Sequence, residues 1–306
     1  MGDPAVRWPD FLIIGAAKAG TTALFKAIGR HPRVFCPAAK EPRFLSYAGA
    51  PPAFRGPHGE SHSRRVIARA SDYHALFSEC PPGSLACEAS TEYLSCTRAP
   101  ATAARFVPDV RLIVMLRHPV DRAFSQFLHH RAEDCEPLDS FEDAWEAGGG
   151  RVASGWRPSY DHRGRCLYAA HLERWRGHFP AERMLILFYE DWLQRPRDVL
   201  SRVWRHLGLE PIESPVVTRE NVTSRLPRWP WLHHRMVDWD NPVRRLAQQV
   251  LPLPVRDAIT RTATAINSSP GPRLDPKLRS RLARTYQDDL SVLEGITGRQ
   301  LDDWRS

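Results

Sequence analysis

The segment FLIIGAAKAGTT, residues 11–22, decides the fold of this 306-residue chain. Its first five residues predict a short buried strand, and a helix is expected from Ala23 to Gly29 with Thr21 or Thr22 as its cap. A Gly/Ala-rich turn between a strand and a helix brings backbone N–H groups and a helix N-terminus together. The segment therefore predicts an anion-binding loop at the carboxyl end of a strand in an α/β fold.

The lysine in this loop is misplaced for a nucleoside triphosphate site. Gly15 and Gly20 have the G-x-x-x-x-G spacing of a nucleotide phosphate loop, but Thr21 stands where that motif has lysine, and the lysine lies inside the loop as Lys18. A triphosphate site needs its lysine on the β- and γ-phosphates and Mg²⁺ on the following hydroxyl. Lys18 instead suits a 5′-phosphate that carries a sulfate, where charge builds on the bridging oxygen as the bond breaks. The alternative is an ordinary strand–helix turn with a solvated lysine.

Strand and helix patterns alternate along the rest of the chain. Strands are predicted at residues 85–89, 111–116 and 184–188, and the apolar run at 111–116 is typical of a strand buried on both faces. Helices are predicted at 119–134, 167–179, 196–207 and 274–293, and loops or irregular segments at 47–72, 148–164 and 211–254. This alternation predicts a three-layer α/β/α fold with a mainly parallel central sheet. Because no internal repeat or clear linker is found, residues 1–306 are expected to form a single domain.

A second motif, RHPVDRAFS, follows the strand at 111–116. It places Arg117 at the strand end and Ser125 in the second turn of the next helix, at the sheet edge where ligands bind. A guanidinium and a hydroxyl suit a phosphate monoester. The alternative is a structural network in which Arg117 and Arg122 pair with carboxylates such as Asp121 or Glu133, and for Arg122 this is the favoured reading.

The composition indicates the charge of the ligand and the cellular compartment. The chain has 43 Lys and Arg against 35 Asp and Glu, a net charge of +8, which favours anionic ligands or serves only solubility. The six cysteines form no CxxC pair and are expected to be free thiols in a reducing compartment. No apolar stretch of 18 residues or signal peptide is found, so a soluble cytoplasmic protein is expected. No HExxH, CxxC or EF-hand pattern predicts a metal, so none is expected.

Together these motifs resemble the sulfotransferase family that uses 3′-phosphoadenosine 5′-phosphosulfate (PAPS), and they are most similar to its heparan sulfate N- and 3-O-sulfotransferase branch and its bacterial relatives. Besides the two motifs above, KEPRFL at 40–45 resembles the family's K-E-x-x-F-F segment. DRAFSQFLHHR at 121–131, which contains His129, resembles the helix that carries a second active-site histidine. LYAAHLERW at 167–175 resembles G-x-Y-x-x-H-L-x-x-W. The resemblance covers roughly residues 10–210 and the final helix, and it implies a P-loop-NTPase-like sulfotransferase fold.

The resemblance also implies roles for individual residues. Glu41 would be the catalytic base, Lys18 would stabilise the leaving group, and His129 would bond the transferring sulfuryl group or assist proton transfer. Glu41 could instead only pair with Lys40 or Arg43, and His129 could be structural, with His130 as its competitor. The residues expected to hold the PAPS donor are Ala17, Lys18, Ala19, Gly20, Thr21, Thr22, Arg117, Ser125 and Tyr168. The family's Lys/Gly/Arg loop that closes over the donor is not evident at 267–273.

Two other functions compete with sulfuryl transfer. A P-loop kinase or NTPase is disfavoured because lysine is missing after Gly20 and no Walker-B carboxylate pair is evident. A non-enzymatic protein that binds nucleic acid or another polyanion is disfavoured because the basic residues are spread along the chain. The acceptor is expected to be a small molecule or a carbohydrate, with no nucleic acid or membrane as partner, and the loops at 47–72, 148–164 and 211–254 are expected to surround it. The Arg, Ala and Pro content hints at a bacterial source, and the oligomeric state is not readable.

Overall fold

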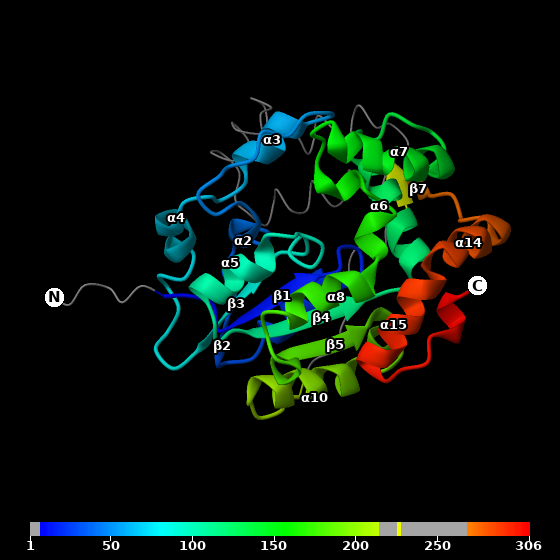
Figure 1. Ribbon diagram of the computed structural model, residues 1–306. Helices are drawn as coiled ribbons and strands as arrows, with labels where there is room; N and C mark the ends of the chain where they lie inside the picture. The colour runs from blue at the N-terminus through cyan, green and yellow to red at the C-terminus, as the bar shows by residue number, and fades with distance from the viewer. Residues whose placement is uncertain (1–6, 214–224, 228–267) are drawn as a thin grey trace.

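The computed structural model describes residues 7–213, 225–227 and 268–306, and these contain a five-stranded parallel sheet (Figure 1). The strands follow the order β2-β3-β1-β4-β5, and every neighbouring pair is parallel. Their bounds are β1 Phe11–Gly15, β2 Val34–Phe35, β3 Leu85–Ala89, β4 Arg111–Leu116 and β5 Met184–Phe188. The four predicted strands are thus confirmed, and β2 is an addition at the edge of the sheet.

Helices cover both faces of the sheet. On one face, α1 (Thr21–Ile28) and α10 (Pro196–Leu207) lie side by side, because the ring of His31, just after α1, packs 5.0 Å from that of Trp204 in α10. On the other face lie α5 (Ala99–Phe106) and α8 (Tyr168–Arg176), drawn above the sheet in Figure 1 while α10 lies below it. This arrangement confirms the three-layer α/β/α prediction.

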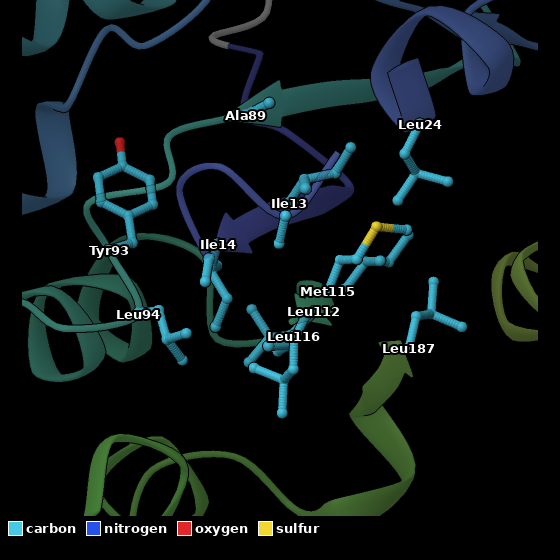
Figure 2. Close-up of a cluster of buried hydrophobic side chains, with 14 of the residues drawn as sticks. Ile13, Ile14, Leu24, Ala89, Tyr93, Leu94, Leu112, Met115, Leu116 and Leu187 are labelled. Carbon is cyan, nitrogen blue, oxygen red and sulfur yellow. The ribbon is translucent and has the colours of Figure 1, made fainter. Parts of the chain in front are cut away.

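The core lies where the central strands meet these helices. Every residue of β1 is buried, and every residue of β4 after Arg111 is buried. Figure 2 shows side chains from β1, β4, β5 and α1 converging in one apolar cluster. Strands that are buried on both faces need apolar residues at every position, which is why 111–116 could be recognised from its sequence.

The remaining elements connect the strands or follow β5 in the chain. The helices are α2 Phe44–Tyr47, α3 Gly59–Arg64, α4 Ala70–Ala75, α6 Pro119–Ala132, α7 Phe141–Ala153, α9 Tyr189–Gln194, α14 Pro276–Ala283 and α15 Gln287–Thr297. Short 3-10 turns are η1 Pro158–Tyr160, η2 Gly164–Cys166, η3 Ala181–Arg183, η4 Arg284–Tyr286 and η5 Asp302–Trp304. A separate antiparallel pair joins β6 Arg225–Pro227 to β7 Ser268–Pro270.

Two of the predicted loops are wrong in part. The segment 47–72 contains α3 and the start of α4, and 148–164 begins inside α7 and continues into η1. Three consecutive glycines predicted a break, but α7 runs through them because Ser140 caps its N-terminus and because Gly148 faces the backbone of Tyr160. A Cβ on Gly148 would lie 2.6 Å from the Tyr160 carbonyl oxygen, so this glycine permits close packing rather than a turn.

Helix ends also differ from expectation. Neither Thr21 nor Thr22 caps α1, because Gly20 is the cap residue and makes no side-chain hydrogen bond. The predicted helix at 274–293 is two helices, α14 and α15, joined by η4, where Tyr286 turns inward and donates a hydrogen bond to the Arg163 carbonyl at 3.1 Å. Most of the irregular segment 211–254 lies outside the described residues. Within the described part of the chain, no helix has the length and apolar character needed to cross a bilayer.

Candidate functional site

The loop between β1 and α1 is held in a defined shape by contacts to β4. The Ala16 N–H donates to the Met115 carbonyl at 2.7 Å, so the loop begins as a continuation of the sheet. Gly20 then adopts the left-handed region, with φ 85°, and a Cβ there would lie 2.9 Å from the ring of Tyr189. Glycine is required at this position for both reasons, and the loop can therefore turn tightly into the N-terminus of α1.

Arg117 connects this loop to the second motif. Its Nη1 donates to the Lys18 carbonyl at 2.9 Å, and its guanidinium lies 4.9 Å from the centre of the Tyr189 ring. The buried Tyr168 donates its hydroxyl proton to the Arg117 carbonyl at 2.9 Å. The structure thus brings Lys18, Arg117 and Tyr168, which are far apart in sequence, into one network at the ends of β1 and β4.

The first turns of α6 carry the other residues of this motif. Ser125 is buried on α6, and Arg122 is buried beside Cys166. Arg122 donates to the Cys166 sulfur at 2.8 Å and to the His162 carbonyl at 2.9 Å. The favoured structural role of Arg122 is thus supported, but the predicted carboxylate partners are wrong: Asp121 pairs with Arg279 instead, at 2.9 Å.

Glu41 lies against the turn that follows β3. Its two carboxylate oxygens accept hydrogen bonds from the Thr91 N–H and the Thr91 hydroxyl, both at 3.0 Å. Lys40 also pairs with Glu41, at 3.4 Å, and the same ammonium lies 3.2 Å from the hydroxyl oxygen of Thr22. The predicted pairing of Glu41 with Lys40 therefore exists, but Thr91 fixes the carboxylate independently of it.

The backbone is strained at two of the candidate catalytic residues. Lys18 has φ 65° and Glu41 has φ 62°, and Arg43, two residues on, has φ 59°. A left-handed conformation costs a non-glycine residue roughly 1–2 kcal/mol. At Glu41 and Arg43, hydrogen bonds to residues distant in sequence stabilise this backbone conformation. The Glu41 N–H donates to the Ala89 carbonyl, and the Arg43 N–H donates to the Ser90 hydroxyl, both at 3.0 Å. Such strain concentrates at functional sites, where the surrounding structure enforces it.

Electrostatics link Lys18 to α6. Burial lowers the pKa of Lys18 to about 8, with Arg117 and Lys40 lowering it further and Glu133 opposing them. Burial and the nearby Lys18 charge lower the pKa of His129 to about 4, so this imidazole is neutral at neutral pH. His129 lies 3.5 Å from Glu133, one turn further along α6. Lys18 therefore interacts electrostatically with Lys40, His129 and Glu133, and the catalytic roles of Lys18, Glu41 and His129 stay predictions.

Sequence reasoning missed several residues of this site. Thr91 is one, and another is Glu88, a fully buried carboxyl in β3 that accepts from the Tyr73 hydroxyl at 3.2 Å. Burial raises the pKa of Glu88 to about 7. Arg165 is a third, because it is buried and donates to the Thr91 carbonyl at 3.4 Å. A glutamate inside an otherwise apolar strand was a signal for Glu88, whereas nothing local marks Thr91 or Arg165.

One cluster beside α6 has the residue types of a metal site. In the described part of the chain, His130, Glu136 and His162 are buried and offer ligand atoms within 4.8 Å of one another. Arg151 already binds both carboxylate oxygens of Glu136, at 2.8 and 2.9 Å. Because the only carboxylate is neutralised by a guanidinium, we interpret the cluster as a buried hydrogen-bonding network, and the expectation that the protein needs no metal stays a prediction.

Comparison with known proteins assigns the family. A sequence model described as "Sulfotransferase family" matches residues 9–213, a range that includes both motifs and Glu41. The chain belongs to the sulfotransferase family. The resemblance inferred from the sequence is thereby confirmed.

Individual relatives of this sulfotransferase point to the same branch. It is 33% identical over 214 residues to human bifunctional heparan sulfate N-deacetylase/N-sulfotransferase 3, covering 67% of this chain and 23% of that protein. It is 29% identical over 222 residues to human heparan sulfate glucosamine 3-O-sulfotransferase 6, covering 72% of this chain and 58% of that protein. The chain thus spans about a quarter of the length of the bifunctional relatives.

A solved structure confirms the fold of this sulfotransferase. The crystal structure of a sulfotransferase from Alicyclobacillus acidocaldarius superposes with a TM-score of 0.77 and 25% sequence identity. The match covers 98% of this chain and 100% of that one. The sulfotransferase fold predicted from the sequence is therefore confirmed.

Proposed function

We propose that this sulfotransferase moves a sulfuryl group from PAPS to a hydroxyl or amino group of an acceptor, with Glu41 as general base. One observation supports this most strongly: Lys18, Arg117 and Glu41 lie at the carboxyl ends of β1, β4 and β3, which are adjacent strands. Ligands of open α/β sheets bind at this edge. A donor and an acceptor bound there would meet between Lys18 and Glu41.

The donor would lie along the loop and the N-terminus of α1. The 5′-phosphosulfate would contact residues 17–22, where the helix dipole and the Lys18 ammonium favour negative charge. Arg117 and Ser125 would bind the 3′-phosphate, through the charge-assisted bonds that a guanidinium makes to phosphate oxygens. Tyr168 would act on this site by holding the Arg117 backbone, since its hydroxyl is bonded to the Arg117 carbonyl.

Sulfuryl transfer needs a base beside the acceptor and a cation beside the leaving 5′-phosphate. Glu41 would accept the acceptor proton, because Thr91 fixes its carboxylate in one orientation beside the loop. Lys18 would stabilise the charge that grows on the leaving 5′-phosphate. His129, neutral and within reach of the Lys18 charge, would donate or accept a hydrogen bond at the sulfuryl group rather than carry a positive charge.

The acceptor class follows from the relatives' names rather than from a built pocket. Their names specify heparan sulfate and its glucosamine residues, so we propose a carbohydrate acceptor first and a small hydroxyl-bearing molecule second. Glu41 as base and Lys18 at the leaving group could act on a hydroxyl or an amine, so the proposal includes both acceptor groups.

Calorimetry with three nucleotides tests the donor assignment. Adenosine 3′,5′-bisphosphate should bind the wild type without Mg²⁺, and Arg117→Met should weaken it about 10- to 100-fold by removing bonds to a charged phosphate. The same variant should lose less affinity for adenosine 5′-phosphate, which lacks the 3′-phosphate, because only the contact of Arg117 with the Lys18 carbonyl bears on that ligand. Arg176→Met, an exposed position on α8, is the matched control. Binding of Mg·ATP in place of the bisphosphate would contradict the proposal.

A further inference from the structure

Lys40, the first residue of the KEPRFL segment, has no role in the transfer proposed between Lys18 and Glu41. Its ammonium lies 3.2 Å from the hydroxyl oxygen of Thr22, in the first turn of α1, and 3.4 Å from Oε1 of Glu41. It therefore contacts one residue at the anion-binding end of the helix and one residue that would activate the acceptor. The side chain is mostly shielded from solvent, with 21% of its surface exposed.

The in-line geometry of sulfuryl transfer defines what lies between those two residues. The acceptor atom must be near Glu41 and the leaving 5′-phosphate near the N-terminus of α1, so the transferring sulfur is held between them. A cation that touches both Thr22 and Glu41 consequently flanks the sulfuryl group. Lys18 approaches from the loop, and the two ammonium groups are close enough for the charge of Lys40 to lower the pKa of Lys18.

The residue type supports the same conclusion. Only Lys18, Lys26, Lys40 and Lys277 are lysines, among 43 basic residues. In a chain that otherwise uses arginine, two of the four lysines lie at this site. An ammonium is a compact point charge that fits beside a small tetrahedral group, whereas a guanidinium is a wide planar fork suited to two parallel bonds.

We propose that Lys40 is a second catalytic cation, which binds the oxygens of the transferring sulfuryl group of the donor. In the reaction, the acceptor oxygen or nitrogen forms a bond to sulfur while the bond between sulfur and the 5′-phosphate oxygen breaks. The acceptor proton passes to Glu41, and the electron pair of the broken bond stays on the phosphate, giving adenosine 3′,5′-bisphosphate. Lys40 keeps its proton throughout and stabilises the sulfuryl oxygens electrostatically. This inference rests on the proposed PAPS-dependent function.

The difference in affinity between PAPS and adenosine 3′,5′-bisphosphate isolates this contact, because the two ligands differ by the sulfuryl group. We expect Lys40→Met to weaken PAPS binding about tenfold by calorimetry and to change bisphosphate binding less than twofold. Lys277→Met, on α14, should change neither. Lys40→Gln, which keeps a donor for Thr22, is the second variant if Lys40→Met fails to fold, and melting temperatures without ligand report on folding.

The outcomes separate the inference from the function on which it rests. If both ligands weaken equally in the Lys40 variants, Lys40 does not contact the sulfuryl group, and the inference is overturned while the donor assignment stands. If the wild type binds neither ligand, the proposed function fails, and the inference fails with it. A selective loss of PAPS affinity supports both.

Discussion

Replacing Gly20 with alanine tests how the phosphate loop is built. The new methyl group would face two separate penalties. Gly20 has φ 85°, where an L-residue is destabilised by roughly 1–2 kcal/mol. Its Cβ would also lie 2.9 Å from two ring atoms of Tyr189, and overpacking of this kind typically costs about 1–3 kcal/mol. We therefore expect Gly20→Ala to lower the free energy of unfolding by about 2–5 kcal/mol.

Gly20→Ala should also weaken ligand binding, because it should displace Arg117. The Tyr189 ring, against which Arg117 stacks, must move to admit the methyl group. Displacing a guanidinium from a phosphate removes charge-assisted hydrogen bonds, so affinity for adenosine 3′,5′-bisphosphate should fall about 10- to 100-fold. Denaturant unfolding and calorimetry measure the two effects separately.

Gly83→Ala is the matched control, because Gly83 also has a left-handed backbone, with φ 79°, but a Cβ there meets nothing within 4 Å. It should show only the backbone penalty and unchanged ligand affinity. In the double variant Gly20→Ala/Tyr189→Ala the steric penalty should disappear, which gives a favourable coupling of about 1–3 kcal/mol. Equal destabilisation by Gly20→Ala and Gly83→Ala, together with additive effects of the two site changes, would refute the reasoning.

Three further predictions concern charge and position. Thr91→Val removes one of the two hydrogen bonds that Thr91 donates to Glu41 and should lower kcat about tenfold without changing bisphosphate affinity, whereas Thr91→Ser should keep the wild-type rate. A loss of bisphosphate affinity in Thr91→Val would contradict a positioning role. Because burial lowers the pKa of Lys18 to about 8, bisphosphate affinity measured by calorimetry should fall as the pH rises from about 7 to 9, and Lys18→Met should abolish that trend; an unchanged trend in the variant would rule out Lys18 as its source. Burial raises the pKa of Glu88 from 4.5 to about 7, so across this window the folded protein holds a proton that the unfolded chain has released. The stability contributed by this group therefore falls as the pH rises, and the melting temperature of Glu88→Gln relative to wild type should increase between pH 5 and 7.5; a constant difference would exclude the effect.

The sheet was readable from the sequence because its strands are buried on both faces. A strand such as β4 must be apolar at each buried position, and the polar residues of the site follow directly after β1 and β4. The apolar strands and the Gly/Ala-rich turn after β1 were therefore enough to predict the fold and the loop that leads into α1.

The rest of the site depends on contacts between distant residues. Glu41 and Thr91 lie 50 residues apart, and the strained backbone at Glu41 is held by Ala89 in β3. No local pattern encodes such pairs, because they exist only once β2, which precedes Glu41, is paired with β3. The helix through Gly148 was missed for a similar reason: its close approach to Tyr160 outweighs the low helix propensity of glycine.

Sulfuryl transfer itself is measured most directly with sulfur-labelled PAPS and a panel of carbohydrate and small-molecule acceptors. The wild type is predicted to move the label to at least one hydroxyl- or amine-bearing acceptor without added metal. Glu41→Gln should bind the bisphosphate normally but transfer label at least 100-fold more slowly, because its side chain can no longer accept a proton. Label transfer by Glu41→Gln at the wild-type rate, or no transfer by the wild type to any acceptor despite tight PAPS binding, would contradict the account.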